Sequence, residues 1–137
     1  MNLERFINAQ RQDFPQALQE IENGRKLTHW MWYIFPQLRG QGYSSTAHLY
    51  GLNGLDEARR FAADPALGRN LRTITQALLD QPLRNANGIF GATDAMKLRS
   101  CMTLFELADP ECSLYGQVLE EFFSGSRDHK TLTMLRF

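Results

Sequence analysis

The chain has 137 residues, of which 43% are hydrophobic and 22% are charged, as in an ordinary water-soluble domain. This length suffices for one domain with a full hydrophobic core. Fifteen Lys and Arg residues balance fifteen Asp and Glu residues, so no overall charge favours nucleic acid or an anionic membrane, and we expect neither as a partner.

The hydrophobic spacing at the start of the chain predicts two helices. Asn2 is a capping residue for the first helix. Asp13 is the capping residue for the second, in which apolar residues from Phe14 to Ile21 recur at i, i+3, i+4 and i+7. Gly24 then supplies a stop signal.

The next segment, residues 29–37, reads His-Trp-Met-Trp-Tyr-Ile-Phe-Pro-Gln. A short apolar run of this kind fits a buried helix or a strand equally well. We predict a short helix that ends near Phe35, because Pro36 disfavours helical geometry in the residue before it. Such an aromatic segment is either the centre of the core or the wall of a pocket.

Two later stretches are predicted to be loops, because glycines and polar residues interrupt any hydrophobic repeat: Arg39–Ser45 and Pro82–Gly91. A short helix is predicted for residues 46–50. Further helices are predicted where a capping residue precedes an apolar stripe, and they begin at Asp64-Pro65, at Thr93 or Asp94, at Asp109-Pro110 and at Asp128. The first three of these end before Pro82, near Ala108 and before Gly125.

Alternating strand patterns are almost absent from the chain. The predicted fold is therefore all-α, a single multihelical domain over residues 1–137 with six to eight helices and little or no sheet. We expect one buried cluster to contain Trp30, Ile34, Leu71, Ile74, Leu98, Phe105, Leu119 and Phe122.

Four sequence blocks together resemble one protein family. They are Phe6-Ile-Asn-Ala-Gln10 with Ala17-Leu18; the segment His29–Gln37; Asp64-Pro-Ala-Leu-Gly68; and Lys97 with Ser100-Cys-Met-Thr-Leu-Phe105. In this order they resemble DUF1810, a family of small bacterial and fungal proteins of unknown function. The resemblance covers nearly the whole chain. It implies a mainly helical fold, and it implies no established reaction, substrate or partner.

Candidate binding residues in the aromatic segment have two interpretations. In a helix, His29 shares a face with Trp32 and Tyr33 at i+3 and i+4. The imidazole then serves as acid, base or donor in a pocket between aromatic rings, or it is a core histidine that donates to a carbonyl. The amide of Gln37 either contacts a ligand or bonds a loop backbone.

The helix predicted to end near Ala108 is apolar nearly all round, which is typical of a central, buried helix. It nevertheless carries Lys97 and, one turn later, Ser100. Their spacing is weak evidence for a catalytic nucleophile; Lys97 either contacts an anion or pairs with Asp94 at i−3. Ser44 and Ser45 either bind an anion at the start of the following helix or simply cap it.

Other classes of site and location are disfavoured. His29, His48 and His129 lie far apart without recognised ligand spacing, and no P-loop or Gly-x-Ser-x-Gly motif is present, so we expect no metal and no cofactor. Cys101 and Cys112 lack disulfide-scaffold spacing. No signal peptide is visible, and no apolar run is long enough to span a bilayer. These features predict a cytoplasmic protein.

Any ligand site is expected between residues 29–37, the loop 40–45 and the helix that carries Lys97 and Ser100. The expected ligand is a small anionic or nucleotide-like molecule, because an imidazole, serine hydroxyls and a lysine would meet there beside aromatic faces. Whether the site is enzymatic stays open. The alternative is a non-catalytic interaction or structural module whose aromatic residues are simply core.

Overall fold

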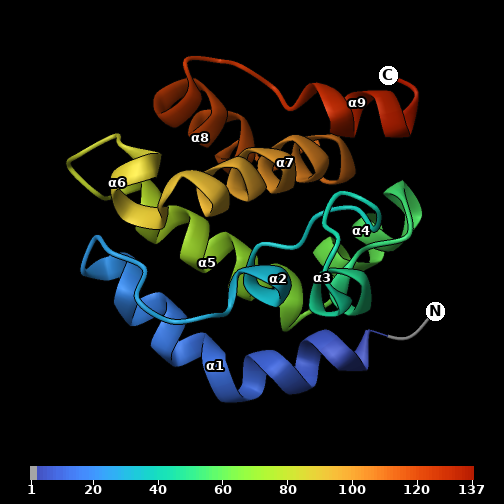
Figure 1. The fold of residues 1–137 in the computed structure, drawn as a ribbon, viewed down its shortest axis with the longest axis horizontal. Helices are drawn as coiled ribbons and strands as arrows, with labels where there is room; N and C mark the ends of the chain where they lie inside the picture. The colour runs from blue at the N-terminus through green and yellow to red at the C-terminus, as the bar shows by residue number, and fades with distance from the viewer. Residues whose placement is uncertain (1–2) are drawn as a thin grey trace.

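Nine helices form among residues 3–137, the part of the chain that the computed structural model describes (Figure 1). They are α1 (Glu4–Glu22), α2 (Met31–Ile34), α3 (Ser45–Tyr50), α4 (Leu55–Ala63), α5 (Leu67–Leu79), α6 (Ala86–Phe90), α7 (Ala92–Ala108), α8 (Leu114–Phe123) and α9 (His129–Leu135). Within that range there is no strand, only an isolated backbone bridge between Leu38 and Leu52. The predicted all-α class is confirmed, although the helices exceed the expected six to eight.

The two helices predicted at the start of the chain are one continuous helix. α1 runs through Asp13, which is therefore not a cap, and Pro15 lies inside it. A proline inside a helix removes one hydrogen bond and costs about 3 kcal/mol. α1 continues because buried residues on both sides of Pro15, among them Phe6 and Ile21, hold its two halves against the core.

Several predicted caps act as expected. Gly24 follows α1 in the left-handed region, with φ of 78°, and its N–H donates to the carbonyl of Ile21. The carboxylate of Asp64 accepts from the backbone N–H of Leu67 at the start of α5, and that of Asp128 caps α9. Asn2, the cap predicted for the first helix, lies outside the described residues.

Two short helices were not predicted. α4 carries Asp56 and Glu57 in its first turn, where acidic residues favour a helix. α6 lies inside the stretch predicted as a loop, because Asn85 caps it by accepting from the N–H of Gly88 at 3.0 Å. α8 begins at Leu114, after the turn that Asp109-Pro110 starts.

α7 is the central helix and packs against α4, α6, α8 and α9 (Figure 1). The ring of Phe105 on α7 lies 5.4 Å from that of Phe61 and 5.9 Å from that of Tyr115, measured between centroids. The predicted core is confirmed, since each of its members is buried: Trp30, Ile34, Leu71, Ile74, Leu98, Phe105, Leu119 and Phe122. Within residues 3–137 no helix is both long enough and apolar enough to cross a membrane.

Glu20 on α1 fixes the start of the aromatic segment. Its carboxylate accepts hydrogen bonds from the backbone N–H groups of Leu27 and Thr28 and from the indole N–H of Trp30, at 2.7, 3.0 and 2.9 Å. Burial opposes the charge, but the hydrogen bonds from the Thr28 hydroxyl, the Gln16 amide and the backbone of Leu27 and Thr28 lower the pKa of Glu20 from 4.5 to about 2. The short helix α2 is thereby anchored to α1.

Candidate functional site

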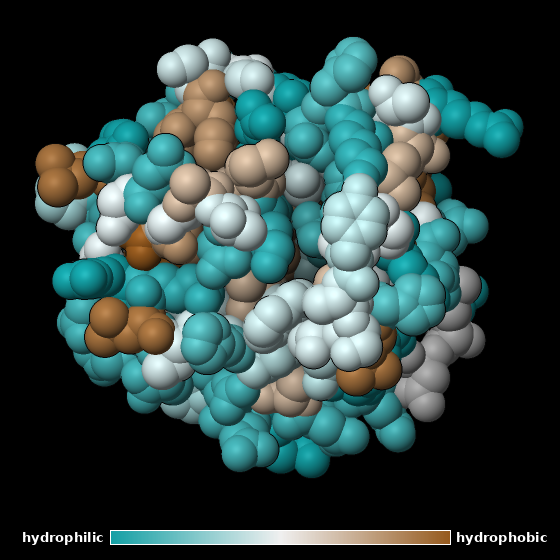
Figure 2. Space-filling model, in the orientation of Figure 1, coloured by the Kyte–Doolittle hydropathy of each residue, from teal (hydrophilic) through white to brown (hydrophobic). Residues whose placement is uncertain are grey.

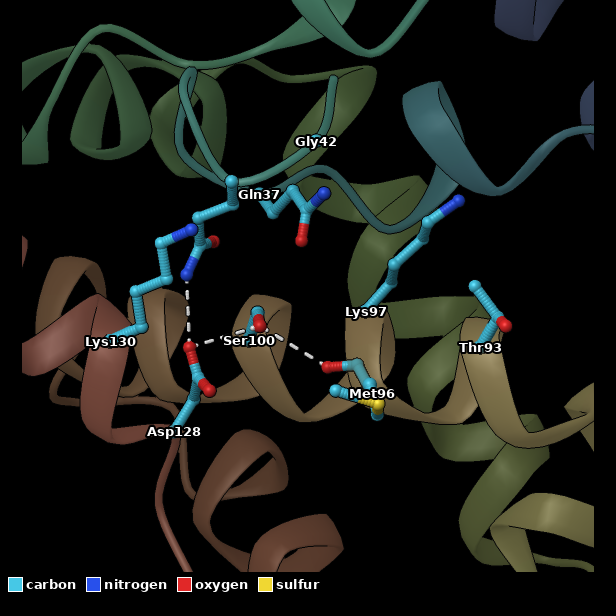
Figure 3. A pocket seen from close by; sticks show the side chains of 9 residues that line it. Gln37, Gly42, Thr93, Met96, Lys97, Ser100, Asp128 and Lys130 are labelled. Carbon is cyan, nitrogen blue, oxygen red and sulfur yellow. Dashed lines mark hydrogen bonds between the residues drawn. The ribbon is translucent and has the colours of Figure 1, made fainter. Parts of the chain in front are cut away.

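A cavity of about 240 Å³ opens between α7, the segment that follows α2, and the start of α9. Figure 2 shows the surface hollowed between α7 and the segment after α2. The lining residues, drawn in Figure 3, are Gln37, Gln41, Gly42, Thr93, Met96, Lys97, Ser100, Asp128 and Lys130. Three segments far apart in the sequence therefore form one site.

α7 forms one wall of the cavity. It contributes Thr93, Met96, Lys97 and Ser100, whose spacing of i, i+3, i+4 and i+7 places them on one face of the helix. Although most of α7 is buried, the Met96 side chain is 63% exposed. This face is therefore the side of the central helix that the fold leaves open.

Lys97 reaches the cavity from a partly buried position. Its Nζ lies 3.4 Å from Oδ1 of Asp94 and 5.3 Å from the centre of the Trp32 ring. The other oxygen of Asp94 lies 3.0 Å from Nζ of Lys26, which sits over Trp30. One carboxylate thus faces two ammonium groups, and positive charge remains at the cavity wall.

Asp128 connects the walls of the cavity through hydrogen bonds. Its Oδ2 accepts hydrogen bonds from Gln41 Nε2 at 2.9 Å, from Ser100 Oγ at 3.0 Å, and from the N–H and hydroxyl of Thr131. Burial alone would raise the pKa of Asp128, yet these hydrogen bonds outweigh it and hold the pKa below its usual value. Asp128 is therefore held in its ionised form, with Oδ2 occupied by hydrogen bonds from the protein.

The hydroxyl of Ser100 lies 3.0 Å from Oδ2 of Asp128 and 3.2 Å from the carbonyl of Met96. Both neighbours are acceptors, and a hydroxyl carries one proton, so it donates to one of them at a time. A carboxylate with a lowered pKa is a weak base. Ser100 is thus placed as a hydrogen-bonding group, without an efficient base to activate it as a nucleophile.

The segment after α2 contributes Gln37, Gln41 and Gly42 and forms a second wall, the loop wall, which lies close to α3. A Cβ at position 42 would lie 2.6 Å from the Cβ of Ala47 and 3.6 Å from Nε2 of Gln37, so only glycine fits there. The amide of Gln41 is oriented by its hydrogen bonds to Asp128 and Thr131. Its oxygen, Oε1, is buried and has no hydrogen-bond partner among residues 3–137.

Lys130 brings a second ammonium group to the cavity, from the first turn of α9. Its Nζ lies 5.8 Å from the centre of the Tyr43 ring. Tyr43 directly follows the lining residue Gly42, and its side chain is 95% exposed. Figure 3 shows Lys97 and Lys130 on different sides of the cavity, with Ser100 between them.

The structure brings together some of the residues proposed from the sequence. Gln37, Lys97 and Ser100 line the cavity, and Trp32 lies beside it under the ammonium group of Lys97. The three segments between which a ligand was expected do meet here. The contact between Lys97 and Asp94, predicted as the alternative role of this lysine, is also present.

Other proposed residues lie elsewhere. His29 is exposed, so the prediction of a core histidine is wrong, and the structure does not place its imidazole in the lining of this cavity. The reason is that α2 begins at Met31, so helical spacing does not relate His29 to Trp32. Ser44 and Ser45 are exposed and outside the lining; the hydroxyl of Ser44 caps α3.

Six lining residues were not among the binding candidates named from the sequence, although the first two lie in the loop 40–45 where a ligand was expected: Gln41, Gly42, Thr93, Met96, Asp128 and Lys130. Helical spacing would have found two of them, since Thr93 lies at i−4 from Lys97 and Met96 at i−4 from Ser100. Asp128 was predicted as a cap, but no local pattern reveals its bond to Ser100. In the described part of the chain, no three His, Cys, Asp or Glu residues are grouped so that they could hold a metal ion.

Fold and cavity together define a multihelical domain with a small, polar, lysine-bearing cavity. The chain belongs to the family described as "Protein of unknown function (DUF1810)", whose model matches residues 1–135, as the sequence blocks indicated. It is similar to the conserved hypothetical protein Rv1873 from Mycobacterium tuberculosis, known from a crystal structure, with 36% identity, a TM-score of 0.96 and coverage of 98% of this chain and 96% of that one. Among curated proteins none matches.

Proposed function

We propose that the cavity binds a small molecule through an anionic group, a phosphate or a carboxylate. The observation that carries this proposal is the pair of lysines, Lys97 and Lys130, on different sides of one cavity. The acidic residue in the lining, Asp128, is ionised and offsets one of these charges, but its Oδ2 is already occupied by donors of the protein, and the two lysines leave the lining net positive.

The neighbouring groups suit an anion. Ammonium groups form charge-assisted hydrogen bonds to phosphate or carboxylate, which are stronger than neutral ones. The carboxamide of Gln37 offers a further donor from the loop wall. Lys97 shares Asp94 with Lys26, so an incoming anion competes with only part of one carboxylate.

The proposal is a binding site, with no reaction assigned to it. Ser100 has no efficient base, because its carboxylate neighbour Asp128 has a lowered pKa. The alternative, an interaction or structural module without a ligand, draws support from the burial of Trp30 and Phe35 in the core. The two ideas differ in what they predict, since only the first expects an anionic molecule to stabilise the protein in a way that depends on the lysines of the cavity.

A thermal-unfolding experiment tests the proposal with ribose 5-phosphate, AMP and citrate as anionic probes and adenosine as an uncharged one. A ligand at 100 times its dissociation constant adds about 2.7 kcal/mol to the stability of the native state. For a domain of this size that raises Tm by several degrees. We expect at least one anionic probe to do so. If none does at millimolar concentration, the proposal is wrong.

The chain offers a matched pair of variants for this experiment. Lys26 and Lys97 both pair with Asp94 and both lie over a tryptophan, but of the two only Lys97 lines the cavity. Lys97→Met should weaken binding of the active probe at least tenfold, whereas Lys26→Met should leave its affinity within about twofold. Equal losses in both variants would show that the effect is on stability alone.

We also propose that the protein works in the cytoplasm. Both cysteines, Cys101 and Cys112, are free thiols, as expected in a reducing compartment. Burial raises the pKa of Cys101 well above its usual value, which makes this thiol unreactive. Fractionation of cells that produce the protein tests this location, and recovery in the membrane or exported fraction would contradict it.

A further inference from the structure

We infer that the bound anion carries an aromatic ring that stacks on Tyr43 at the mouth of the cavity, and that the ligand is of the nucleoside monophosphate class. This inference rests on the proposed function and names the chemistry of the part of the ligand that lies outside the cavity. Three observations support it: the size of the cavity, the exposure of Tyr43, and the contact of Lys130, a lining residue, with the Tyr43 ring.

The cavity is too small to enclose such a ligand completely. Its volume is about 240 Å³, below the roughly 300–1,000 Å³ of sites that bury most of a ligand. A phosphate with its sugar fits this space. A base attached to that sugar must project past the rim, where the loop wall carries Gly42 and the α7 wall carries Met96.

The residue next to that rim, Tyr43, has an aromatic ring that is not packed in the core. Tyr43 is 95% exposed, so its ring contributes almost nothing to the core. Tyrosine combines a large flat apolar surface with a polar tip, and stacking of a base on such a ring is sequence-tolerant and favourable. The exposed thioether of Met96 offers a second, polarisable contact from the facing wall.

Lys130 links the ring to the anion. Its ammonium group lies 5.8 Å from the centre of the Tyr43 ring and also belongs to the cavity lining. An anionic group held by Lys130 therefore has its aromatic portion within reach of Tyr43. This arrangement disfavours simple anions such as citrate, which have nothing to place against the ring.

The charge of the cavity favours a single phosphate. The lining holds two lysines, Lys97 and Lys130, against one carboxylate, Asp128, and a phosphate monoester carries a charge between −1.5 and −2 at neutral pH. A triphosphate would leave most of its charge uncompensated. The chain also lacks the glycine-rich loop ending in Gly-Lys-Ser/Thr that cradles a nucleoside triphosphate.

Isothermal titration of the full chain with AMP, ribose 5-phosphate and adenosine tests the inference. We expect AMP to bind about tenfold more tightly than ribose 5-phosphate, because only AMP has a base to stack. Tyr43→Ala should remove this advantage and leave the affinity for ribose 5-phosphate unchanged, while Tyr43→Phe should keep it. Leu83→Ala is the control, since Leu83 is 73% exposed and lines a different cavity.

The outcomes separate this inference from the proposed function. If ribose 5-phosphate binds in a manner that depends on Lys97, and AMP binds no better, the anion site stands and the aromatic contact is wrong. If Tyr43→Ala weakens both probes equally, the stacking inference is wrong as well. If neither probe binds but citrate raises Tm, the inference is wrong and the anion site stands, and if no anionic probe binds, both proposals fail.

Discussion

Lys26, which follows α1, and Lys97, which lies on α7, share the carboxylate of Asp94. Their Nζ atoms lie 3.0 and 3.4 Å from its two oxygens, and each ammonium group also lies over an indole ring, that of Trp30 or of Trp32. The segment before α2 is thereby fastened to the first turn of α7. The same arrangement leaves Lys97 incompletely neutralised where it meets the cavity.

Replacing Asp94 with Asn should destabilise the protein by about 1–2 kcal/mol. The substitution removes two partly buried ion pairs and a negative charge in the first turn of α7. Urea denaturation measures the free energy of unfolding. Asp56→Asn is the matched control, because Asp56 is also in a first turn and also paired, but with an 85% exposed side chain, and should cost less than about 0.5 kcal/mol.

Glu20 should make stability depend on pH in the acidic range. Its pKa is about 2 in the folded protein against an ordinary 4.5, so its contribution is fully present above pH 4.5 and is lost as the pH falls toward 2. The contribution at neutral pH is on the order of 3 kcal/mol. Denaturant titrations at pH 7, 4 and 2.5 measure it.

The comparison with Glu20→Gln isolates this residue from Asp128, whose pKa is also lowered. The variant should be clearly less stable than the wild type at pH 7, and the difference should shrink to a minor fraction at pH 2.5, because the unfolded chain binds a proton at Glu20 well before the folded protein does. A constant difference across this range would contradict the assignment. Glu22→Gln, an exposed position on the same helix, should have little effect at any pH.

Asp128→Asn should cost more stability than Ser100→Ala. The first substitution weakens the hydrogen bonds from Gln41, Ser100 and Thr131 at once, and hydrogen bonds to a charged group contribute about 1.5–3 kcal/mol each. The second removes one donor and leaves the others in place, at a cost of about 1 kcal/mol. Equal costs would show that Asp128 does not join the cavity walls.

Phe105→Ala should destabilise the protein by about 3–5 kcal/mol. The side chain is fully buried on the central helix and contacts the rings of Phe61 and Tyr115. Met96→Ala on the open face of α7 is the control and should change the free energy of unfolding by less than about 0.5 kcal/mol. A loss below about 1 kcal/mol for Phe105→Ala would contradict the packing described above.

Gly68→Ala should destabilise α5, although alanine is normally the better helix former. A Cβ at position 68 would lie 2.1 Å from the carbonyl oxygen of Ala62 in α4, and backbone cannot move aside as a flexible side chain can. Overpacking of this kind costs about 1–3 kcal/mol. The measurement is a thermal melt, and a variant with unchanged or higher Tm would mean that the two helices separate easily.

Local signals in the sequence accounted for most of the fold. The stop at Gly24 and the caps at Asp64 and Asp128 act within one helical turn, so they can be read without knowing what packs against them. The break predicted at Asp13 failed for the opposite reason. There the decisive term is burial on both sides of Pro15, which involves residues from other helices.

The candidate site was harder to predict because it depends on approach between distant segments. Lys97 and Ser100 could be singled out as polar residues on an apolar helix, and both line the cavity. His29 was misplaced, since its assumed helical register with Trp32 does not exist. Lys130 had no local feature that distinguishes it from an ordinary surface lysine, and its role follows only from where α9 packs.

The hydrogen bond between Gln41 and Asp128 has a consequence for folding. These residues are 87 positions apart in the sequence, so bringing them together requires closure of a long loop, whose entropy cost is offset only by contacts formed elsewhere. The cavity is therefore complete only when α9 has docked on α7. A nascent chain still lacking α9 has no such site, and a shortened protein that ends before Asp128 would lose it even if the remaining helices assembled.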